Sequence, residues 1–168
     1  MRYIVLLAVI LLSGCASTAD IGSICPKTGF LDNTRTITYL APELKKDNVV
    51  AVATIQGLSG DCKFRDKDCN MLDVSLTLPF AAQKGTAGGD LKDKELPYFI
   101  AVLSPGEEIL QRQAFSTKID FDNAGTGSNT EEHIVRIPLK VRDDADKYKV
   151  IIGFALTRDQ LKYNEDHK

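Results

Sequence analysis

Apolar and polar residues alternate along much of this 168-residue chain, which is the pattern of a β-strand with one buried face. The longest alternating run lies at 72–80, and its apolar members are Leu72, Val74, Leu76, Leu78 and Phe80. In a strand, residues two apart point to the same face, so these five side chains would share one face. The pattern therefore predicts a strand over 72–80 that covers a hydrophobic core.

Further strands follow from the same kind of pattern. The predicted strands, which turn-forming residues separate, lie at 36–39, 49–55, 98–103, 115–121, 135–139 and 148–156. The runs at 49–55 and 98–103 are more continuously apolar than the others, which predicts strands covered on both faces. Gly-rich and polar composition predicts a loop at 57–61 and two mobile loops at 84–94 and 123–130.

The end of the chain predicts a short helix. Thr157 and Gln160 have the spacing of a capping box, in which their side chains satisfy the first free amides of a helix. Leu161 would then dock that helix on the rest of the domain. Seven or eight short strands with turn-rich gaps fit a sandwich better than a βαβ pattern. We therefore predict an all-β, antiparallel, immunoglobulin-like β-sandwich over 25–168, with a short C-terminal helix.

The first fifteen residues predict an export signal. An apolar run follows Arg2 and has about half of the roughly 20 residues that a membrane-spanning helix needs. It closes with Leu12-Ser13-Gly14-Cys15, which resembles the lipobox of bacterial lipoproteins. The resemblance implies a signal peptide at 1–14, attachment of acyl chains such as palmitate at Cys15, and a lipidated tether at 15–24. A plain cleavable signal peptide, with Cys15 at the cleavage site by chance, is the alternative.

The residue after the lipobox cysteine indicates which membrane holds the lipoprotein. Ala16 resembles the outer-membrane kind of lipoprotein, since inner-membrane retention usually has Asp at that position. Three acyl chains, at about 0.8 kcal/mol per buried methylene, would make an effectively permanent anchor. The expected location is the outer membrane, with the domain facing the periplasm; exposure at the cell surface remains an alternative.

Three cysteines remain once lipid has taken Cys15, and the compartment is oxidising. We favour a disulfide between Cys25 and Cys62, which would tie the start of the domain to its first hairpin and add roughly 3–4 kcal/mol. A Cys62–Cys69 pair, which would staple one hairpin, is the alternative. Under the favoured pairing Cys69 is left with a free thiol, and no Cys-x-x-Cys motif suggests a redox role for it.

Charge and motif content exclude several functions. The formal net charge is −2 and no basic stripe is present, so nucleic acid is not an expected partner. Ser59 lies in a sequence that faintly resembles a nucleophile elbow, but the second Gly and the following helix are missing. Its only potential bases are His133, expected to be exposed and idle, and His167, expected to lie in a frayed tail.

Acidic residues offer two further candidates. Asp120 and Asp122 would lie on the polar face of one strand, where ordinary carboxylate pKa values are expected and glycoside cleavage is not. Asp61, Asp66 and Asp68 could form a loose calcium site, although the segment lacks the Gly and Glu of a complete calcium loop. We expect no cofactor and no zinc or iron site.

Parts of the mature chain resemble small uncharacterised proteobacterial lipoproteins. The resemblance covers most of the mature chain loosely and lies in the residues 96–103 and 153–164, Cys25-Pro26 and Gly60-Asp61-Cys62. It supports the membrane location and the pairing of Cys25 with Cys62, and it implies no activity. Cys69 and its surroundings depart from the pattern.

These observations lead to an expected function. The chain is expected to be a non-enzymatic outer-membrane lipoprotein that acts as an accessory or adaptor subunit of an envelope assembly, with an envelope protein as its partner. Exposed sheet edges can accept a strand from such a partner. The alternative is a periplasmic binding module for a small molecule or cell-wall glycan, with loops 84–94 and 123–130 forming its site.

Overall fold

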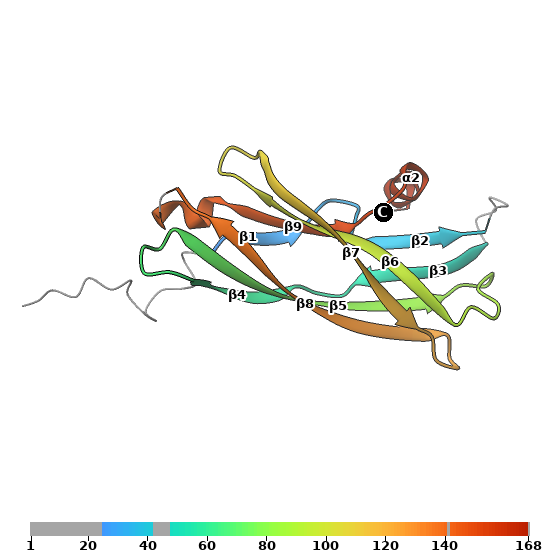
Figure 1. Ribbon diagram of the computed structural model, residues 1–168. Coiled ribbons are helices and arrows are strands. Elements are labelled where there is room, and N and C mark those ends of the chain that lie inside the picture. The colour runs from blue at the N-terminus through green and yellow to red at the C-terminus, as the bar shows by residue number, and fades with distance from the viewer. Residues whose placement is uncertain (1–24, 42–47, 141, 168) are drawn as a thin grey trace, which may run out of the picture.

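The computed structural model describes residues 25–41, 48–140 and 142–167, which form two β-sheets packed face to face (Figure 1). The strands are β1 (Lys27–Phe30), β2 (Thr36–Leu40), β3 (Val49–Ile55), β4 (Ser59–Phe64), β5 (Met71–Lys84), β6 (Asp93–Leu103), β7 (Ile109–Asp120), β8 (Thr126–Pro138) and β9 (Lys149–Phe154). A 3-10 helix, η1 (Arg142–Lys147), precedes β9, and the α-helix α2 (Arg158–Asp166) follows it. The all-β sandwich with a short C-terminal helix confirms the predicted fold class.

Each sheet has a simple strand order. The first sheet runs β1-β9-β6-β7, and β1 with β9 is the one parallel pair among the described strands. In the second sheet β5 is central: β3 and β4 share one of its edges and β8 follows the other. The hairpin between β7 and β8 crosses from the first sheet to the second, so these two strands end their sheets on the same side of the sandwich (Figure 1).

The described part contains nine strands, more than the seven or eight predicted. The first segment of the domain contributes one strand to each sheet, because β1 pairs with β9 and β2 then pairs with β3 in the other sheet. The predicted loop at 57–61 is also partly wrong, since Ser59 already begins β4 and pairs with Thr77 of β5. Short polar strands such as β1 and β4 carry no clear alternation, which is why the pattern missed them.

The core lies between the sheets and confirms the longest predicted pattern. All five apolar side chains of the 72–80 run are buried. Phe80 of β5 lies 5.0 Å from Tyr98 of β6 and 5.9 Å from Phe154 of β9, measured between ring centroids. Aromatic pairs at this separation add to the gain from burying apolar area, so this cluster fixes how the two sheets face each other.

The two strands predicted to be covered on both faces differ. β6 is buried on both, and on its outer face the guanidinium of Arg112 lies 4.6 Å from the ring centroid of Phe99. β3 buries only one face, because Val50, Val52 and Thr54 lie on the outer face of the second sheet and are half-buried. The prediction for 49–55 was therefore wrong about its second face.

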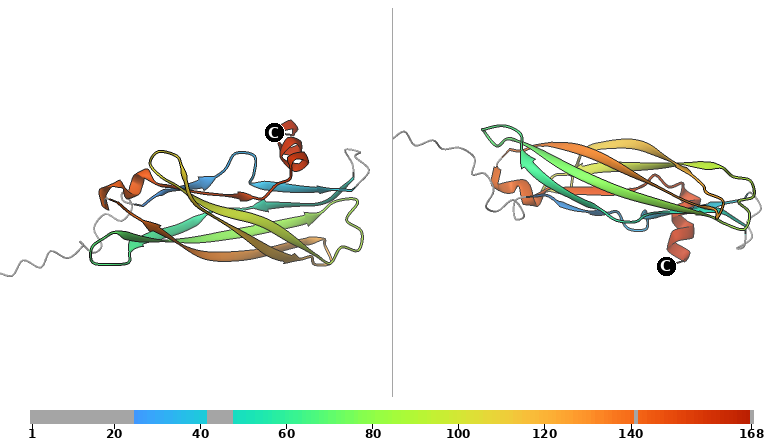
Figure 2. Two further views of the ribbon diagram at one scale, coloured as in Figure 1. Left: turned by 45° about the horizontal axis from the view of Figure 1, so that its top comes forward. Right: turned by 90° about the horizontal axis from the view of Figure 1, so that it is seen from below.

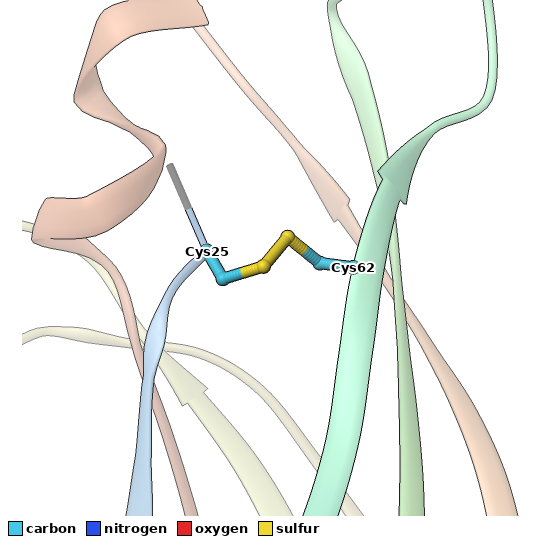
Figure 3. Close-up of a disulfide and its surroundings, with 2 residues drawn as sticks. All are labelled: Cys25 and Cys62. Carbon is cyan, nitrogen blue, oxygen red and sulfur yellow. A yellow bond between two sulfur atoms is a disulfide. The ribbon is translucent and has the colours of Figure 1, made fainter. Parts of the chain in front are cut away.

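A disulfide between Cys25 and Cys62 confirms the favoured pairing (Figure 3). It joins the segment before β1 to β4, and so links the two sheets, with the Cα atoms 5.7 Å apart. The expectation of a free thiol at Cys69 is wrong, because Cys69 is itself disulfide-bonded. The predicted signal peptide, Cys15 and the tether lie outside the described residues.

The sandwich is elongated, and its two ends carry different features. β1, the first described strand, begins toward the end that also contains η1 and the hairpin between β4 and β5 (Figure 1). The β5–β6 and β7–β8 connections lie at the opposite end (Figure 2). The chain therefore enters the domain at one end, and the β5–β6 and β7–β8 connections, which lie in the predicted mobile loops, are at the other end.

Candidate functional site

The long outer edge of β8 is the most extended unpaired edge in the described part of the chain. β8 pairs with β5 through thirteen consecutive residue pairs, from Met71↔Pro138 to Gln83↔Thr126, without a shift in register. The other edge strands are shorter or less regular: β7 has twelve residues and a register shift in its pairing with β6, β1 has four residues and β2 has five. A long, regular edge presents a row of backbone donors and acceptors to which another strand can add. At the two ends of this edge some are already bonded within the domain: the carbonyl of Thr126 accepts from the amide of Asp122, and the carbonyl of Arg136 accepts from Nε2 of Gln111.

Exposed aliphatic side chains lie on β7 and β8, the strands that end the two sheets on this side. Among the described residues, the large hydrophobic side chains that are exposed are Ile109 (64%), Leu110 (50%), Ile134 (60%) and Leu31 (43%). The first two are on β7 and Ile134 is in the middle of β8. Single exposed aliphatic residues are ordinary, so Ile134 adds one apolar group to the β8 edge and does not by itself form a patch.

Polar side chains close the space between β7 and β8. The hydroxyl of Thr117 donates a 2.7 Å hydrogen bond to Oε1 of Glu131. Nδ2 of Asn129 donates to Oγ1 of Thr117 at 2.8 Å and to Oε1 of Glu131 at 3.0 Å. Thr117 is buried, so its polar atoms need these partners. The three residues form a network that joins the edge strands of the two sheets.

His133 extends this network toward the core. Its Nε2 lies 2.8 Å from the hydroxyl oxygen of Tyr98, and its ring centroid lies 4.4 Å from that of Phe115. Burial lowers the pKa of His133, and the carboxylate of Glu131 acts in the opposite direction. Burial, with a smaller effect of Glu131, raises the pKa of Tyr98. Both groups are therefore held neutral near pH 7, and the expectation of an exposed, idle His133 was wrong.

The two glycine-rich segments predicted as loops meet at the far end of the sandwich. The backbone amide of Phe121 donates to the carbonyl of Lys92, and the amide of Lys84 donates to the carbonyl of Gly125, each at 2.8 Å. A hollow of about 450 Å³ lies between them, lined by Lys84, Gly89, Asp90, Leu91, Lys92, Phe121, Asp122 and Asn123. Residues 126–130, predicted as loop, instead belong to β8.

The carboxylate of Asp122 organises the β7–β8 turn. It accepts hydrogen bonds from the backbone amides of Ala124 and Thr126 and from the Thr126 hydroxyl. These bonds lower the pKa of Asp122, those from Thr126 most. Asp120, the other member of the predicted pair, lies 3.3 Å from Nζ of Lys118 instead. The two carboxylates therefore have separate structural partners.

The other catalytic and metal candidates are likewise separated. Ser59 on β4 and His133 on β8 lie on opposite sides of β5, about 10 Å apart at the strand spacing of a sheet. Asp66 accepts a 3.0 Å hydrogen bond from the amide of Asn70 and so closes its own loop. Within the described ranges, no three His, Cys, Asp or Glu side chains gather as metal ligands would.

Sequence reasoning missed the contacts of Tyr98, Asn129, Glu131 and His133, although a signal for them exists. Asn129, Glu131 and His133 continue the two-residue period of Val135 and Ile137, and so share the inward face of β8. Their polar identity favoured an exposed assignment. β8 lies at the edge of its sheet, where polar groups can be accommodated between the sheets. This edge position depends on the strand order, and the two-residue period gives no information about strand order.

No family model, curated protein or solved structure matches this chain. Among the described residues, no helix combines the length and the apolar character needed to cross a membrane.

Proposed function

We propose that this protein is a non-enzymatic outer-membrane lipoprotein that serves as an accessory or adaptor subunit of an envelope assembly. The outer edge of β8 is the observation that supports this proposal most strongly. A partner would add an extended segment to this edge, gaining backbone hydrogen bonds along the strand and an apolar contact at Ile134.

The placement of this edge suits a tethered protein. The described chain begins at one end of the sandwich, and β8 runs from the far end back toward it (Figure 1). A lipid at Cys15 would confine the domain to a layer beside the membrane, which raises the effective concentration of any partner in that layer. A weak strand-addition contact can then suffice for a stable assembly.

Replacement of Cys15 tests the anchor. The Cys15→Ser variant is expected to leave the membrane fraction, and the wild-type amino-terminal peptide is expected to carry a thioether-linked diacylglycerol by mass spectrometry. Retention of the variant in the membrane fraction, or a wild-type amino-terminal peptide without the diacylglycerol, would contradict lipid attachment.

Chemical cross-linking in intact cells, followed by mass spectrometry, tests the adaptor role separately. One envelope protein should be recovered repeatedly, through residues of β7 or β8. Recovery of abundant neighbours alone, with cross-links scattered over all strands, would contradict the adaptor role without bearing on the anchor.

The hollow between the 85–92 connection and the β7–β8 turn favours a second candidate function, a binding module for a small molecule or cell-wall glycan. Phe121 offers an apolar surface there, while Asp90, Lys92 and Asn123 offer hydrogen-bonding groups. Ligand sites combine an apolar wall with a few polar groups in this way. The two segments expected to form such a site come together, and this observation supports the candidate.

Thermal unfolding with soluble muropeptides distinguishes the two functions. A binding module should show a midpoint that rises with muropeptide concentration, because a ligand that binds only the folded state stabilises it. Asn123→Ala should abolish the rise, whereas Asn70→Ala, in a loop at the opposite end, should not. An unchanged midpoint in the wild type would eliminate muropeptides as ligands of this hollow.

A further inference from the structure

A second hollow lies between α2 and β2. Figure 2 shows α2 standing beside β2. It has a volume of about 250 Å³ and is lined by Asn33, Arg35, Thr36, Thr38, Tyr163, Asn164 and His167. Neither the edge of β8 nor the 85–92 connection contributes to it. Its lining differs from that of the first hollow because it contains cationic and neutral polar side chains and no carboxylate.

Arg35 is held in a fixed position at this hollow. Its Nε donates to the carbonyl of Ile55 at 2.9 Å and its Nη2 donates to the carbonyl of Gln56 at 2.7 Å. The guanidinium also lies 4.9 Å from the ring centroid of Phe30. None of the ion pairs of the described residues includes Arg35. The guanidinium is thus oriented by neutral groups, and Arg35 is exposed to solvent with no acidic partner among the described residues.

The opposite wall, from α2, is arranged in a similar way. The rings of Tyr163 and His167 are stacked with centroids 4.1 Å apart, and Nδ1 of His167 lies 2.8 Å from the carbonyl of Tyr163. That contact leaves Nε2 of His167 at the other side of the ring. In the described part of the chain the Tyr163 hydroxyl has no hydrogen-bond partner. The wall therefore offers a hydroxyl and a ring nitrogen for hydrogen bonding.

The way in which α2 docks preserves the hollow. α2 has no buried residue, and the predicted anchor Leu161 is only half-buried. Nδ2 of Asn164 donates to the carbonyls of Asn33 and Thr36, each at 2.8 Å, and Nε2 of Gln160 donates to the carbonyl of Thr38 at 3.4 Å. A helix docked through an apolar stripe would fill the space against β2. Amide side chains instead hold this helix beside β2 with a gap.

We infer that this hollow binds an oxyanion, a phosphate or carboxylate group carried by a small polar molecule. Arg35 would supply a charge-assisted hydrogen bond, and the Tyr163 hydroxyl would donate from the opposite wall. The volume accommodates the charged group together with a body of about the size of one sugar. The site is independent of strand addition at β8, so either can fail without the other.

A titration of the full-length protein in detergent micelles, followed by NMR, tests this site. Sodium phosphate and N-acetylmuramic acid are added separately, with sodium chloride at matched ionic strength as the reference. Saturable shifts of the His167 ring signals and the Asn164 side-chain amide are expected, with a dissociation constant in the millimolar range. Tighter binding of phosphate would identify a phosphate ligand, and tighter binding of N-acetylmuramic acid a carboxylate ligand.

Three variants locate the binding. Arg35→Gln should weaken binding about tenfold or more, since a hydrogen bond to a charged group is lost. Tyr163→Phe keeps the ring stack and should weaken binding by a smaller factor, which covers the case in which Arg35→Gln does not fold. Arg158→Gln, an exposed residue of α2 outside the lining, should leave binding unchanged. Absence of saturable shifts with either probe, or an equal loss in Arg158→Gln, would overturn the inference.

Discussion

The hydroxyl of Tyr98 lies 2.8 Å from Nε2 of His133, so a side chain of β6 in one sheet is joined to the edge strand β8 of the other. With both groups neutral, the hydroxyl can donate to the unprotonated ring nitrogen. Burial keeps both in that state, since it lowers the pKa of His133 and raises that of Tyr98. The contact between β8 and the first sheet therefore includes an imidazole that burial favours in its neutral form.

Acidification should weaken the fold through His133. The pKa of His133 is lower in the folded state than the unfolded value of about 6.5, so the unfolded chain takes up the proton first. The contribution of His133 to folding stability is then fully present above its pKa in the unfolded chain. It is lost as the pH falls toward its pKa in the folded protein. We expect the free energy of unfolding, measured by urea denaturation, to fall between pH 7.5 and 5.5 more in the wild type than in His133→Gln.

The comparison of the wild type with His133→Gln isolates the titration of His133. Glutamine keeps a hydrogen-bonding group near Tyr98 but does not titrate, and the lowered carboxylate pKa values of Glu107 and Asp122 take effect only at lower pH. An identical pH dependence in both proteins would show that His133 does not couple protonation to folding.

Removal of the Cys25–Cys62 disulfide should destabilise the domain strongly. The two residues are 37 positions apart, and closing a loop of this length stabilises the folded state by about 4 kcal/mol in the chain-entropy account. The Cys25→Ala/Cys62→Ala double variant is therefore expected to unfold at much lower urea concentration than the wild type. A loss below about 1 kcal/mol would mean that the inter-sheet packing alone fixes this end of the sandwich.

Two glycines of the first sheet form a matched pair. A Cβ added at Gly153 of β9 would overlap Oγ1 of Thr34, in the segment that crosses from β1 to β2, whereas a Cβ at Gly29 of β1 meets nothing within 4 Å. Gly153→Ala should cost about 1–3 kcal/mol, as overpacking does. Gly29→Ala should leave stability unchanged or raise it by up to about 1 kcal/mol. Equal effects in thermal unfolding would contradict the close approach at Gly153.

The docking of α2 should be separable from global stability. Asn164→Ala removes two hydrogen bonds to the β1–β2 segment, each worth about 1 kcal/mol. We expect faster hydrogen exchange of the α2 amides and unchanged exchange in β5, with the exposed Lys162→Ala as the control. Unchanged protection of α2 in Asn164→Ala would mean that other contacts hold the helix.

The sequence predicts the regular part of this fold well. The period-two runs identify β5, β7, β9 and the second half of β8, and Thr157 with Gln160 forms the predicted capping box. Each of these signals is local, because one buried face or one cap determines the residue types within a few positions. The core residues of β5 could therefore be named from the pattern alone.

The candidate sites are harder to predict because they depend on contacts between distant segments. Gly127 and the polar residues after it suggested a loop, yet they form the start of β8. A Cβ at Gly127 would overlap the backbone carbonyl of Asp120, so the glycine lets the two strands approach closely. Likewise, the hollow at Arg35 requires α2 to fold back on β2, about 130 residues earlier in the chain.

Site-specific photo-cross-linking from β8 is the most direct test of the proposed adaptor role. A photoreactive amino acid replaces Ile134 in the full-length protein, and Lys63, exposed on β4 at the other side of β5, is replaced as the control. On irradiation of intact cells, the Ile134 probe should yield one discrete adduct with an envelope protein, and the Lys63 probe should not. No adduct from Ile134, or the same adducts from both positions, would contradict binding at the edge of β8.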